Sequence, residues 1–393
     1  MYNALRSPAL LLLAGCLALA ACGGGGGGNS AAPPSSDAPP APPPAPPAQE
    51  PAAVFPTAEW ATATPADMNM TAGKLDDARN YSLIGGGSGL IARHGRVVYT
   101  WGDTVARYTL KSATKSVGGI ALGLALDDGR VQLTDSAQLH LSKMGVPPQR
   151  NVATGWLDQI TILQLATHTA GFEKPGGFIP LQFEPGTTWF YSDGGANWLA
   201  DVLTQVYGED LNSVLFSRVF STIGITTDML SWRDNASRTD TLNGVKRREI
   251  SSGIEANVDA MARIGYLFLR NGAWNGQRVL SESFVTLVHT PRPETLAATN
   301  GEPDVYPRVT QNYGVLWWTN TSGEMPGVPR DAYWAWGLGD NLIVVIPSLD
   351  LVIARTGNNP DDSSLPQLRT DRSGDYKVLV PLLTPIVESV TDD

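Results

Sequence analysis

The chain has 393 residues, of which 42% are hydrophobic and 17% charged, which is enough for one large or two ordinary folded domains. The formal net charge of −10 argues against a nucleic-acid partner, because nucleic-acid-binding surfaces are strongly basic. The only two cysteines, Cys16 and Cys22, lie near the N-terminus. A disulfide or a cysteine metal site in the remainder of the chain is therefore excluded.

The first 21 residues have the pattern of a signal peptide. Arg6 precedes an apolar run, Pro8–Ala21, that is too short for an ordinary membrane span. The run ends in Leu-Ala-Ala-Cys22, which resembles the bacterial lipobox, whose cysteine is acylated after cleavage. Alternatives are lipidation at Cys16 or an ordinary secretory signal. We expect a signal peptide over residues 1–21, a lipid anchor at Cys22 and a lipoprotein of the bacterial cell envelope, on the periplasmic side or at the outer membrane.

Residues 22–56 are rich in Gly, Pro, Ala and Ser and nearly uncharged, which predicts a tether without a core. The folded domain is expected over residues 57–393. Its first element is a hairpin over Leu90–Gly102. Helical spacing of apolar residues follows, and strand patterns return late in the chain. The expected helices are Asp158–Thr167, Gly195–Tyr207, Leu211–Ile223, Asn257–Asn271 and Tyr376–Val390, and the expected late strands are Gly314–Thr319, Leu342–Pro347 and Asp350–Thr356.

This order of elements predicts an α+β fold. Strands near both ends of the domain favour an antiparallel sheet built from both termini and flanked by helices. The helical segments between them predict an inserted, mainly helical lobe. A cleft between the sheet and this lobe is the expected position of a functional site.

Ser112-Ala-Thr-Lys115 stands where a strand-like region gives way to a buried amphipathic helix over residues 117–126. Residues three apart share a helix face, so the Lys115 amine can lie beside the Ser112 hydroxyl. The helix N-terminus adds a positive field. Taken alone, the pair is equally compatible with a helix cap and a solvated charge.

Two later motifs change this interpretation. Tyr191-Ser-Asp193 is a loop that opens a helix, and Trp336-Gly337-Leu-Gly339-Asp340 is a glycine-rich lead into a strand. The ordered set resembles the serine β-lactamase and penicillin-binding-protein superfamily. Within it, the chain is most similar to the class C-type branch, which includes family VIII carboxylesterases and 6-aminohexanoate-dimer hydrolases.

The resemblance implies a β-lactamase/transpeptidase-like fold and an acyl-enzyme on Ser112. Lys115 and Tyr191 would move the protons, and whether the general base is Lys115 or Tyr191 stays open. The oxyanion donors implied are the backbone N–H groups of Ser112 and Asp340. Gly337 and Gly339 would let a substrate approach the strand closely.

The chain departs from the family pattern at substrate-binding positions. Gly337-Leu-Gly339 replaces Lys-Thr-Gly or His-x-Gly, so the group that helps to hold a β-lactam carboxylate is missing. Asp193 should disfavour anionic substrates and can pair with Lys115. Tryptophans near this motif either line an apolar wall or pack in the core, with Trp336 the expected substrate contact. The others are Trp317, Trp318 and Trp334.

These departures favour an esterase or amidase acting on a small ester, amide or peptide. The alternatives are a β-lactamase or D-alanyl-D-alanine carboxypeptidase, and a catalytically inactive tethered binding protein. An α/β-hydrolase is not expected, because no Gly-x-Ser-x-Gly occurs. We expect no metal or other cofactor, since the four histidines form no His-Glu-x-x-His motif. His168 is expected to bond to backbone and not to act as a base.

Overall fold

The structure is a computed structural model that describes residues 54–357 and 376–391. The predicted signal peptide, Cys22 and residues 22–53 of the predicted tether lie outside the described residues. The fold includes residues 54–56, three residues before the predicted boundary. The N–H of Val54 donates to the carbonyl of His94 at 3.3 Å, and the rings of Phe55 and Tyr266 pack edge to face with centroids 5.4 Å apart.

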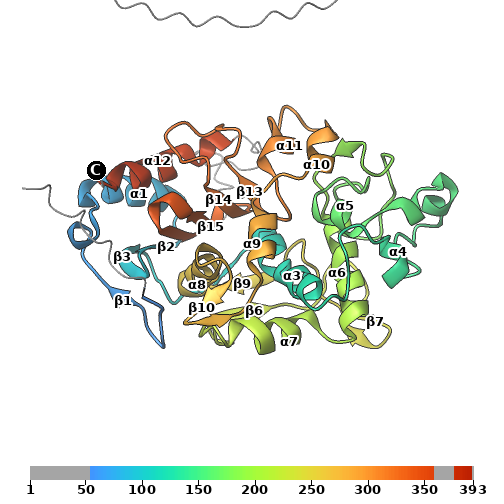
Figure 1. The fold of residues 1–393 in the computed structure, drawn as a ribbon, viewed down its shortest axis with the longest axis horizontal. Coiled ribbons are helices and arrows are strands. Elements are labelled where there is room, and N and C mark those ends of the chain that lie inside the picture. The colour runs from blue at the N-terminus through green and yellow to red at the C-terminus, as the bar shows by residue number, and fades with distance from the viewer. Residues whose placement is uncertain (1–53, 358–375, 392–393) are drawn as a thin grey trace, which may run out of the picture. The chain divides into compact units, whose positions relative to one another are not determined.

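A seven-stranded sheet combines strands from both ends of the domain (Figure 1). Its order is β1-β3-β2-β16-β15-β14-β13, and its neighbours are antiparallel except for the parallel pair β1–β3. The predicted α+β class and the sheet built from both termini are confirmed. The strands are β1 Ala61–Thr62, β2 Ser88–Arg93, β3 Arg96–Trp101, β13 Trp318–Thr319, β14 Tyr333–Gly337, β15 Asn341–Ile346 and β16 Leu351–Thr356.

Helices cover both faces of this sheet, because alternate strand residues enter two different cores. In β15, Leu342 and Val344 pack with α1 (Ala72–Ile84) and α12 (Val380–Ser389), which lie side by side in Figure 1. The intervening Ile343 packs in the other core with α8 (Val258–Leu269). The β15 strand is therefore apolar along its whole length.

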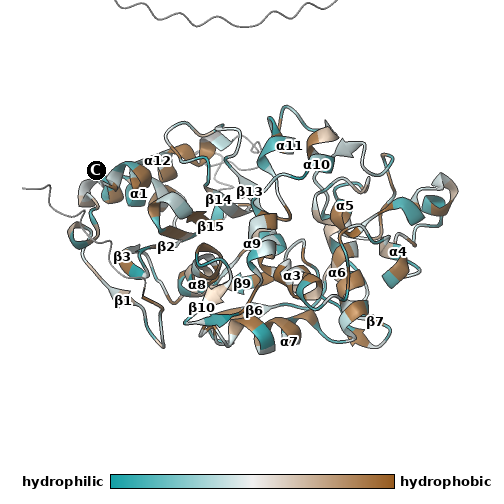
Figure 2. Ribbon diagram, viewed as in Figure 1, coloured by the Kyte–Doolittle hydropathy of each residue, from teal (hydrophilic) through white to brown (hydrophobic). Residues whose placement is uncertain are grey.

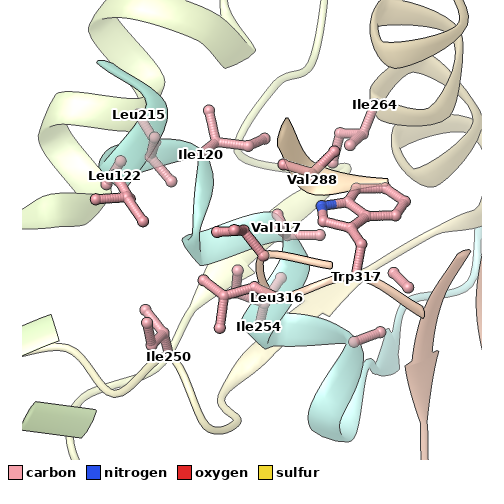
Figure 3. Packing of buried hydrophobic residues seen from close by; sticks show 14 of the residues in the cluster. Val117, Ile120, Leu122, Leu215, Ile250, Ile254, Ile264, Val288, Leu316 and Trp317 are labelled. Carbon is pink, nitrogen blue, oxygen red and sulfur yellow. The ribbon is translucent and has the colours of Figure 1, made fainter. Parts of the chain in front are cut away.

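The mainly helical lobe is inserted between β3 and β13, as predicted (Figure 1). Figure 2 shows hydrophobic residues gathered along α6 and α8, and Figure 3 shows Val117 and Ile120 packed near Trp317. None of the described helices is long and apolar enough to cross a membrane. Besides α8, the helices of the inserted lobe are α2 Thr114–Gly118, α3 Ile120–Asp127, α4 Ala137–His140, α5 Ile162–Ala166, α6 Asp193–Tyr207, α7 Leu211–Leu215, α9 Glu282–Val288, α10 Pro293–Ala297 and α11 Val309–Asn312.

Short elements connect these helices and strands. A three-stranded sheet, β4-β9-β6, and three two-stranded pairs lie outside the main sheet. The short strands are β4 Tyr108–Thr109, β5 Thr188–Trp189, β6 Leu230–Trp232, β7 Thr241–Leu242, β8 Val245–Lys246, β9 Ile254–Ala256, β10 Ala273–Trp274, β11 Gln277–Arg278 and β12 Thr299–Asn300. The 3-10 turns are Ala66–Met68, Lys111–Ala113, Gln149–Thr154, Leu157–Gln159, Pro347–Leu349 and Tyr376–Val378, and Phe216–Phe220 is a π-helical turn.

Several predicted helices are shorter than their apolar patterns. The helix over residues 117–126 divides into α2 and α3 at Gly119, whose ψ of −14° lies outside the usual helical value. The helix predicted from residue 158 begins only at α5, because Thr161 and Gln164 form a capping box. The helix over residues 211–223 leaves α-helical geometry after Leu215.

The strand predictions are wrong near the third motif, the glycine-rich segment Trp336–Asp340. The strand expected over residues 314–319 is reduced to β13, and the glycine-rich lead expected before residue 342 contains the five-residue strand β14. The β14 sequence Tyr-Trp-Ala-Trp-Gly contains three aromatic residues, a type that favours strands, and all five of its residues are buried. Its C-terminal end brings the glycines beside the segment that carries Ser112.

Candidate active site

Ser112 lies in the 3-10 turn Lys111–Ala113 that leads into α2. The segment is held from one side, because the N–H of Leu110 donates to the carbonyl of Ile254 at 2.8 Å. Lys111 has a φ of 51°, in the left-handed region that residues other than glycine rarely adopt. Half-buried Ser112 lines a cavity of about 540 Å³.

Lys115 follows one turn later, and its ammonium is surrounded by oxygen atoms. Its Nζ lies 3.4 Å from the Ser112 Oγ, 2.5 Å from the Asp193 Oδ1 and 3.1 Å from the Ser251 carbonyl. The Lys115 side chain is 2% exposed, whereas that of Asp193 is 28% exposed. The structure therefore brings Ser112, Lys115 and Asp193 into one hydrogen-bonded group.

The charge state of Lys115 follows from two opposing effects. Burial by itself lowers the pKa of Lys115, but attraction to Asp193 and to Tyr191 outweighs burial, so this pKa is raised above its usual value. Lys115 is then an ammonium at neutral pH. The ion pair with Asp193, which the sequence offered as a possible pairing, therefore decides the charge of Lys115.

Tyr191 is positioned by the loop that starts α6. Ser192 is the helix cap, since its Oγ accepts the N–H of Gly195 at 2.9 Å and donates to the carbonyl of Glu173 at 2.6 Å. The backbone N–H of Tyr191 donates to the Glu302 Oε2 at 2.7 Å. The backbone of Tyr191 is therefore fixed by a hydrogen bond. Its side chain lines the same cavity as Ser112.

His168 supports this loop through the backbone, as predicted. Its Nδ1 accepts the N–H of Ser192 at 3.2 Å, and its ring lies 4.6 Å from the Tyr191 ring, centroid to centroid. Burial, together with the positive charges of Lys115 and Lys174, holds the pKa of His168 well below its usual value. A neutral, buried imidazole of this kind positions the tyrosine loop.

The Tyr191 ring is packed between aromatic and cationic groups. Tyr306 and Trp318 stack on it at centroid distances of 5.6 Å and 6.1 Å. The ammonium of Lys115 lies 4.7 Å from the ring centroid, and that of Lys174 lies 3.9 Å from it. The Tyr191 ring is therefore fixed by aromatic stacking, and two lysine ammonium groups lie close to it.

Three of these cavity residues are absent from the sequence-based candidates. Lys174, Glu302 and Tyr306 all line the cavity with Ser112. They belong to loops without a recognised motif, and Glu302 and Tyr306 follow β12, which pairs with β5 just before Tyr191. Burial raises the pKa of the half-buried Glu302, while the Tyr191 N–H and Lys174 oppose this shift. The pairing of β12 with β5 explains why the loop with Glu302 and Tyr306 lies beside Tyr191.

The third motif forms the other wall of the cavity. Gly337 is required there, because a Cβ at this position would lie 1.9 Å from the Leu110 carbonyl oxygen. Leu338, which is 41% exposed, lines the cavity with Trp336. Gly339 has a φ of 85° in the turn that follows. The cavity wall at Gly337 and Leu338 is therefore apolar.

Asp340, expected as an oxyanion donor, does not line this cavity. It is 5% exposed, and its Oδ1 accepts the indole N–H of Trp336 at 3.1 Å. Gly339 does not line the cavity either. The backbone at the wall is that of Gly337 and Leu338, because the chain turns back towards β15 immediately afterwards.

The four tryptophans near the motif divide into two pairs. All four are buried in the two hydrophobic cores, but only Trp318 and Trp336 also line the cavity. Both predicted readings of the tryptophans therefore occur in this molecule. Among the described residues, no group of three or more His, Cys, Asp or Glu side chains is arranged to hold a metal ion.

Comparison with known proteins agrees with this architecture. A family model described as Beta-lactamase matches residues 75–372. Three solved structures share the fold at low sequence identity. They are a candidate beta-lactamase of Bacteroides dorei (TM-score 0.63, 14% identity, covering 81% of this chain and 99% of that chain), a candidate 6-aminohexanoate-dimer hydrolase of Bacillus anthracis (0.58, 17%, 86% and 88%) and a family VIII carboxylesterase (0.57, 15%, 81% and 98%).

These structural likenesses, at or below 17% identity, concern the fold. The family model, by contrast, spans well over half of the 393 residues and includes Ser112, Lys115 and Tyr191. The predicted superfamily resemblance is confirmed, and the chain belongs to the Beta-lactamase family.

Proposed function

We propose that this protein is a serine hydrolase that cleaves an ester or amide bond through an acyl-enzyme on Ser112. The observation that carries the proposal is the shared cavity of Ser112 and Tyr191, with the Lys115 Nζ 3.4 Å from the Ser112 Oγ. A serine hydroxyl becomes a useful nucleophile only when a neighbouring group takes its proton. This arrangement supplies such a group and a place for the carbonyl.

In acylation, the Ser112 Oγ attacks the carbonyl carbon, and its proton moves to the Tyr191 oxygen as Tyr191 passes its own proton on towards the leaving group. We assign this role to Tyr191 because an ammonium at Lys115 cannot accept a proton. Lys115 supplies positive charge to both Ser112 and Tyr191. As the bond to the leaving group breaks, the proton from Tyr191 reaches the departing alkoxide or amine.

The tetrahedral intermediate needs donors for its oxyanion. We assign them to the backbone N–H of Ser112 and, in place of Asp340, to that of Leu338, whose residue lines the cavity. In deacylation, Tyr191 takes a proton from water, and the resulting oxygen attacks the acyl carbon. The ester bond to Ser112 breaks, the proton returns to the Ser112 Oγ, and the acid product leaves.

The cavity favours neutral substrates with an apolar group. Its apolar lining consists of the tryptophans at 318 and 336 with Val305 and Leu338, and the last two are exposed. Exposed apolar side chains inside a cavity mark a surface that a ligand covers. The carboxylates of Asp193 and Glu302 line the same space and oppose an anionic group. These features favour an esterase or amidase.

A fluorophosphonate probe tests the nucleophile. We expect the full chain to be labelled at Ser112, with labelling lost in Ser112→Ala and kept in Ser116→Ala. Ser116 is a matched control because it is buried on α2, the helix that follows Ser112, and donates to the Leu316 carbonyl outside the cavity. Folded protein that takes no label would instead support an inactive binding protein.

One observation favours the alternative activities. The exposed Lys174 lines the cavity and offers an ammonium that a substrate carboxylate can meet. β-Lactams and D-alanyl-D-alanine peptides both carry such a carboxylate. A panel of short p-nitrophenyl esters, an anilide, nitrocefin and a stem peptide separates the activities. We expect the esters to have the highest kcat/KM, and a nitrocefin or stem-peptide value above theirs would establish the alternative.

We also propose that the chain is a lipoprotein of the bacterial envelope. The proposal is supported by the sequence before Cys22 and lies outside the described residues. Replacing Cys22 with serine should release the protein from the membrane fraction, whereas Cys16→Ser should not. If only Cys16→Ser releases the protein, the lipid anchor is at Cys16. If both variants stay on the membrane, a lipobox anchor is excluded.

A further inference from the structure

A buried network stands behind the apolar wall of the cavity. Its centre is Asp340, which takes a left-handed φ of 56° at the turn between β14 and β15. From there its carboxylate reaches back to Trp336, the wall residue, and accepts the indole N–H at 3.1 Å. Trp336 and Asp340 are 7% and 5% exposed, so this bond is shielded from solvent.

Arg355 holds the same turn from the neighbouring strand β16. Its guanidinium donates to the Asp340 carbonyl at 3.0 Å and to the Gly339 carbonyl. It also donates to the Ser82 Oγ of α1 at 3.1 Å, which anchors it to the helix that covers the sheet. The turn is thus tied to two elements that do not touch the cavity.

We infer that Asp340 is a positioning residue that fixes Trp336, and with it the apolar wall, through the buried hydrogen bond to the indole nitrogen. The bond acts on the orientation of a cavity side chain and not on the reacting atoms. Asp340 therefore governs how well an apolar substrate group fits. For its kinetic consequence, this inference rests on the proposed function.

The bond should change strength with pH. Burial raises the pKa of Asp340 to about 6, although the charge of Arg355 and the Trp336 hydrogen bond both oppose this shift. Above that pH the carboxylate accepts a charge-assisted hydrogen bond, and below it the protonated group accepts a weaker one. The wall should therefore be held more firmly at alkaline pH than at acidic pH.

The other groups around the network keep their charge over this range. Arg355 remains a cation, since an arginine titrates only far above neutral pH. Tyr81 of α1 faces Asp340, and burial raises its pKa to about 12. Burial also raises the pKa of Tyr376, whose ring packs against Trp336. Glu302 shares the cavity with Trp336, and burial raises its pKa as well, so loss of the indole titration in Asp340→Asn is what assigns the titration to Asp340.

Indole ¹⁵N–¹H NMR of the full chain, recorded from about pH 5 to pH 8, tests the bond without requiring activity. Trp336→Phe assigns the resonance. In the unsubstituted protein we expect the Trp336 signal to titrate with its midpoint near pH 6. Asp340→Asn should abolish that titration while keeping an oxygen acceptor. Asp350→Asn should leave it intact, because Asp350 has a similar φ of 47° but contacts His94 and Arg270.

The kinetic arm compares a bulky aryl ester with an acetate ester too small to need the wall. We expect the KM of the aryl ester to rise roughly three- to tenfold from pH 8 to pH 5 relative to that of the acetate ester. In Asp340→Asn this relative pH dependence should vanish, and in Trp336→Phe the Asp340→Asn change should have no further effect on KM.

The outcomes separate the two proposals. An unchanged indole titration in Asp340→Asn, measured on protein that melts cooperatively, overturns the positioning role. An indole titration as expected, but with no ester hydrolysis at any pH, overturns the proposed function while the network stands. If Asp340→Asn does not fold, the wild-type titration still decides, because a Trp336 signal that is invariant through pH 6 overturns the inference by itself.

Discussion

The two walls of the cavity are built on opposite principles. On the wall formed by α2 and the start of α6, Lys115 contacts Ser112 and Asp193 through hydrogen bonds of 3.4 Å and 2.5 Å. On the wall formed by β14, Trp336 and Leu338 present apolar surface, and the polar groups lie behind it. The first wall therefore places charged side chains at the reacting serine, whereas the second presents only apolar side chains to the substrate.

This contrast separates the reaction from the choice of substrate. The groups that move protons are in direct contact and are packed by the aromatic stack around Tyr191. Trp318 links the two walls, because its ring stacks on Tyr191 and packs edge to face on Trp336 with centroids 5.4 Å apart. The separation is therefore tested at Leu338 and not at Trp318. The four predictions below alter one wall at a time, and each expects the other to keep its function.

The largest effect is expected at the nucleophile. Ser112→Ala should lower kcat/KM for p-nitrophenyl acetate by about 10³-fold or more, because the remaining residues have no group to form the acyl-enzyme. Steady-state kinetics with the Ser116→Ala control measures the loss. Hydrolysis that survives in Ser112→Ala, with the melting temperature unchanged, would remove Ser112 from the mechanism.

The second effect concerns the buried cation. Lys115→Met should lower kcat/KM by about 10²- to 10⁴-fold, the range of a group that assists proton transfer. Lys174→Met removes the other ammonium near the Tyr191 ring and should cost much less, because Lys174 is exposed. Equal losses in the two variants would show that positive charge near Tyr191 matters and the contact with Ser112 does not.

The charged wall was largely predictable from sequence. Ser112 and Lys115 are three residues apart, in the 3-10 turn and the helix α2 that follows it, and Tyr191 and Asp193 stand at the start of α6, so local spacing specifies each pair. Their mutual contact required only the family order of motifs. The protonation state of Lys115 was not predictable, since it depends on the balance between burial and a carboxylate 78 positions away in sequence.

The apolar wall was predictable only in outline. The glycines at 337 and 339 indicated a close approach, but the glycine-rich lead gave no sign of strand β14. Asp340, an oxyanion donor only by the family resemblance, does not line the cavity. Lys174 and Glu302 had no signal, because they reach the site through loops whose positions depend on tertiary contacts such as the β5–β12 pairing. The α+β class survived these errors, since it depends only on element order.

The third prediction tests the ion pair through stability. Asp193→Asn should lower the free energy of unfolding by about 1–3 kcal/mol at pH 7, because buried Lys115 loses its charged partner while keeping the Ser251 carbonyl. The folded pKa of Lys115 is raised, so this stabilisation is fully present below its unfolded pKa and is lost as pH rises through the folded pKa.

Urea unfolding at pH 7 and above about pH 11 measures this difference. We expect the gap between the wild type and Asp193→Asn to shrink as the pH rises above the unfolded pKa of lysine, because the charge of Lys115 is lost through its raised folded pKa. A gap of the same size at both pH values would mean that Asp193 stabilises the fold by some route other than the charge of Lys115.

The smallest effect is expected at the apolar wall, and it is the one that separates the walls most directly. Leu338→Ser removes an exposed apolar side chain from the cavity lining. Covering part of a leucine on binding contributes about 1 kcal/mol, so KM for a bulky aryl ester should rise about fivefold while kcat and the KM for an acetate ester stay nearly constant. Leu296→Ser is the matched control, because Leu296 is similarly exposed, at 49%, but lies outside the cavity. A fall in kcat for both esters in Leu338→Ser would show that this wall also serves the reaction, and the division between the two walls would fail.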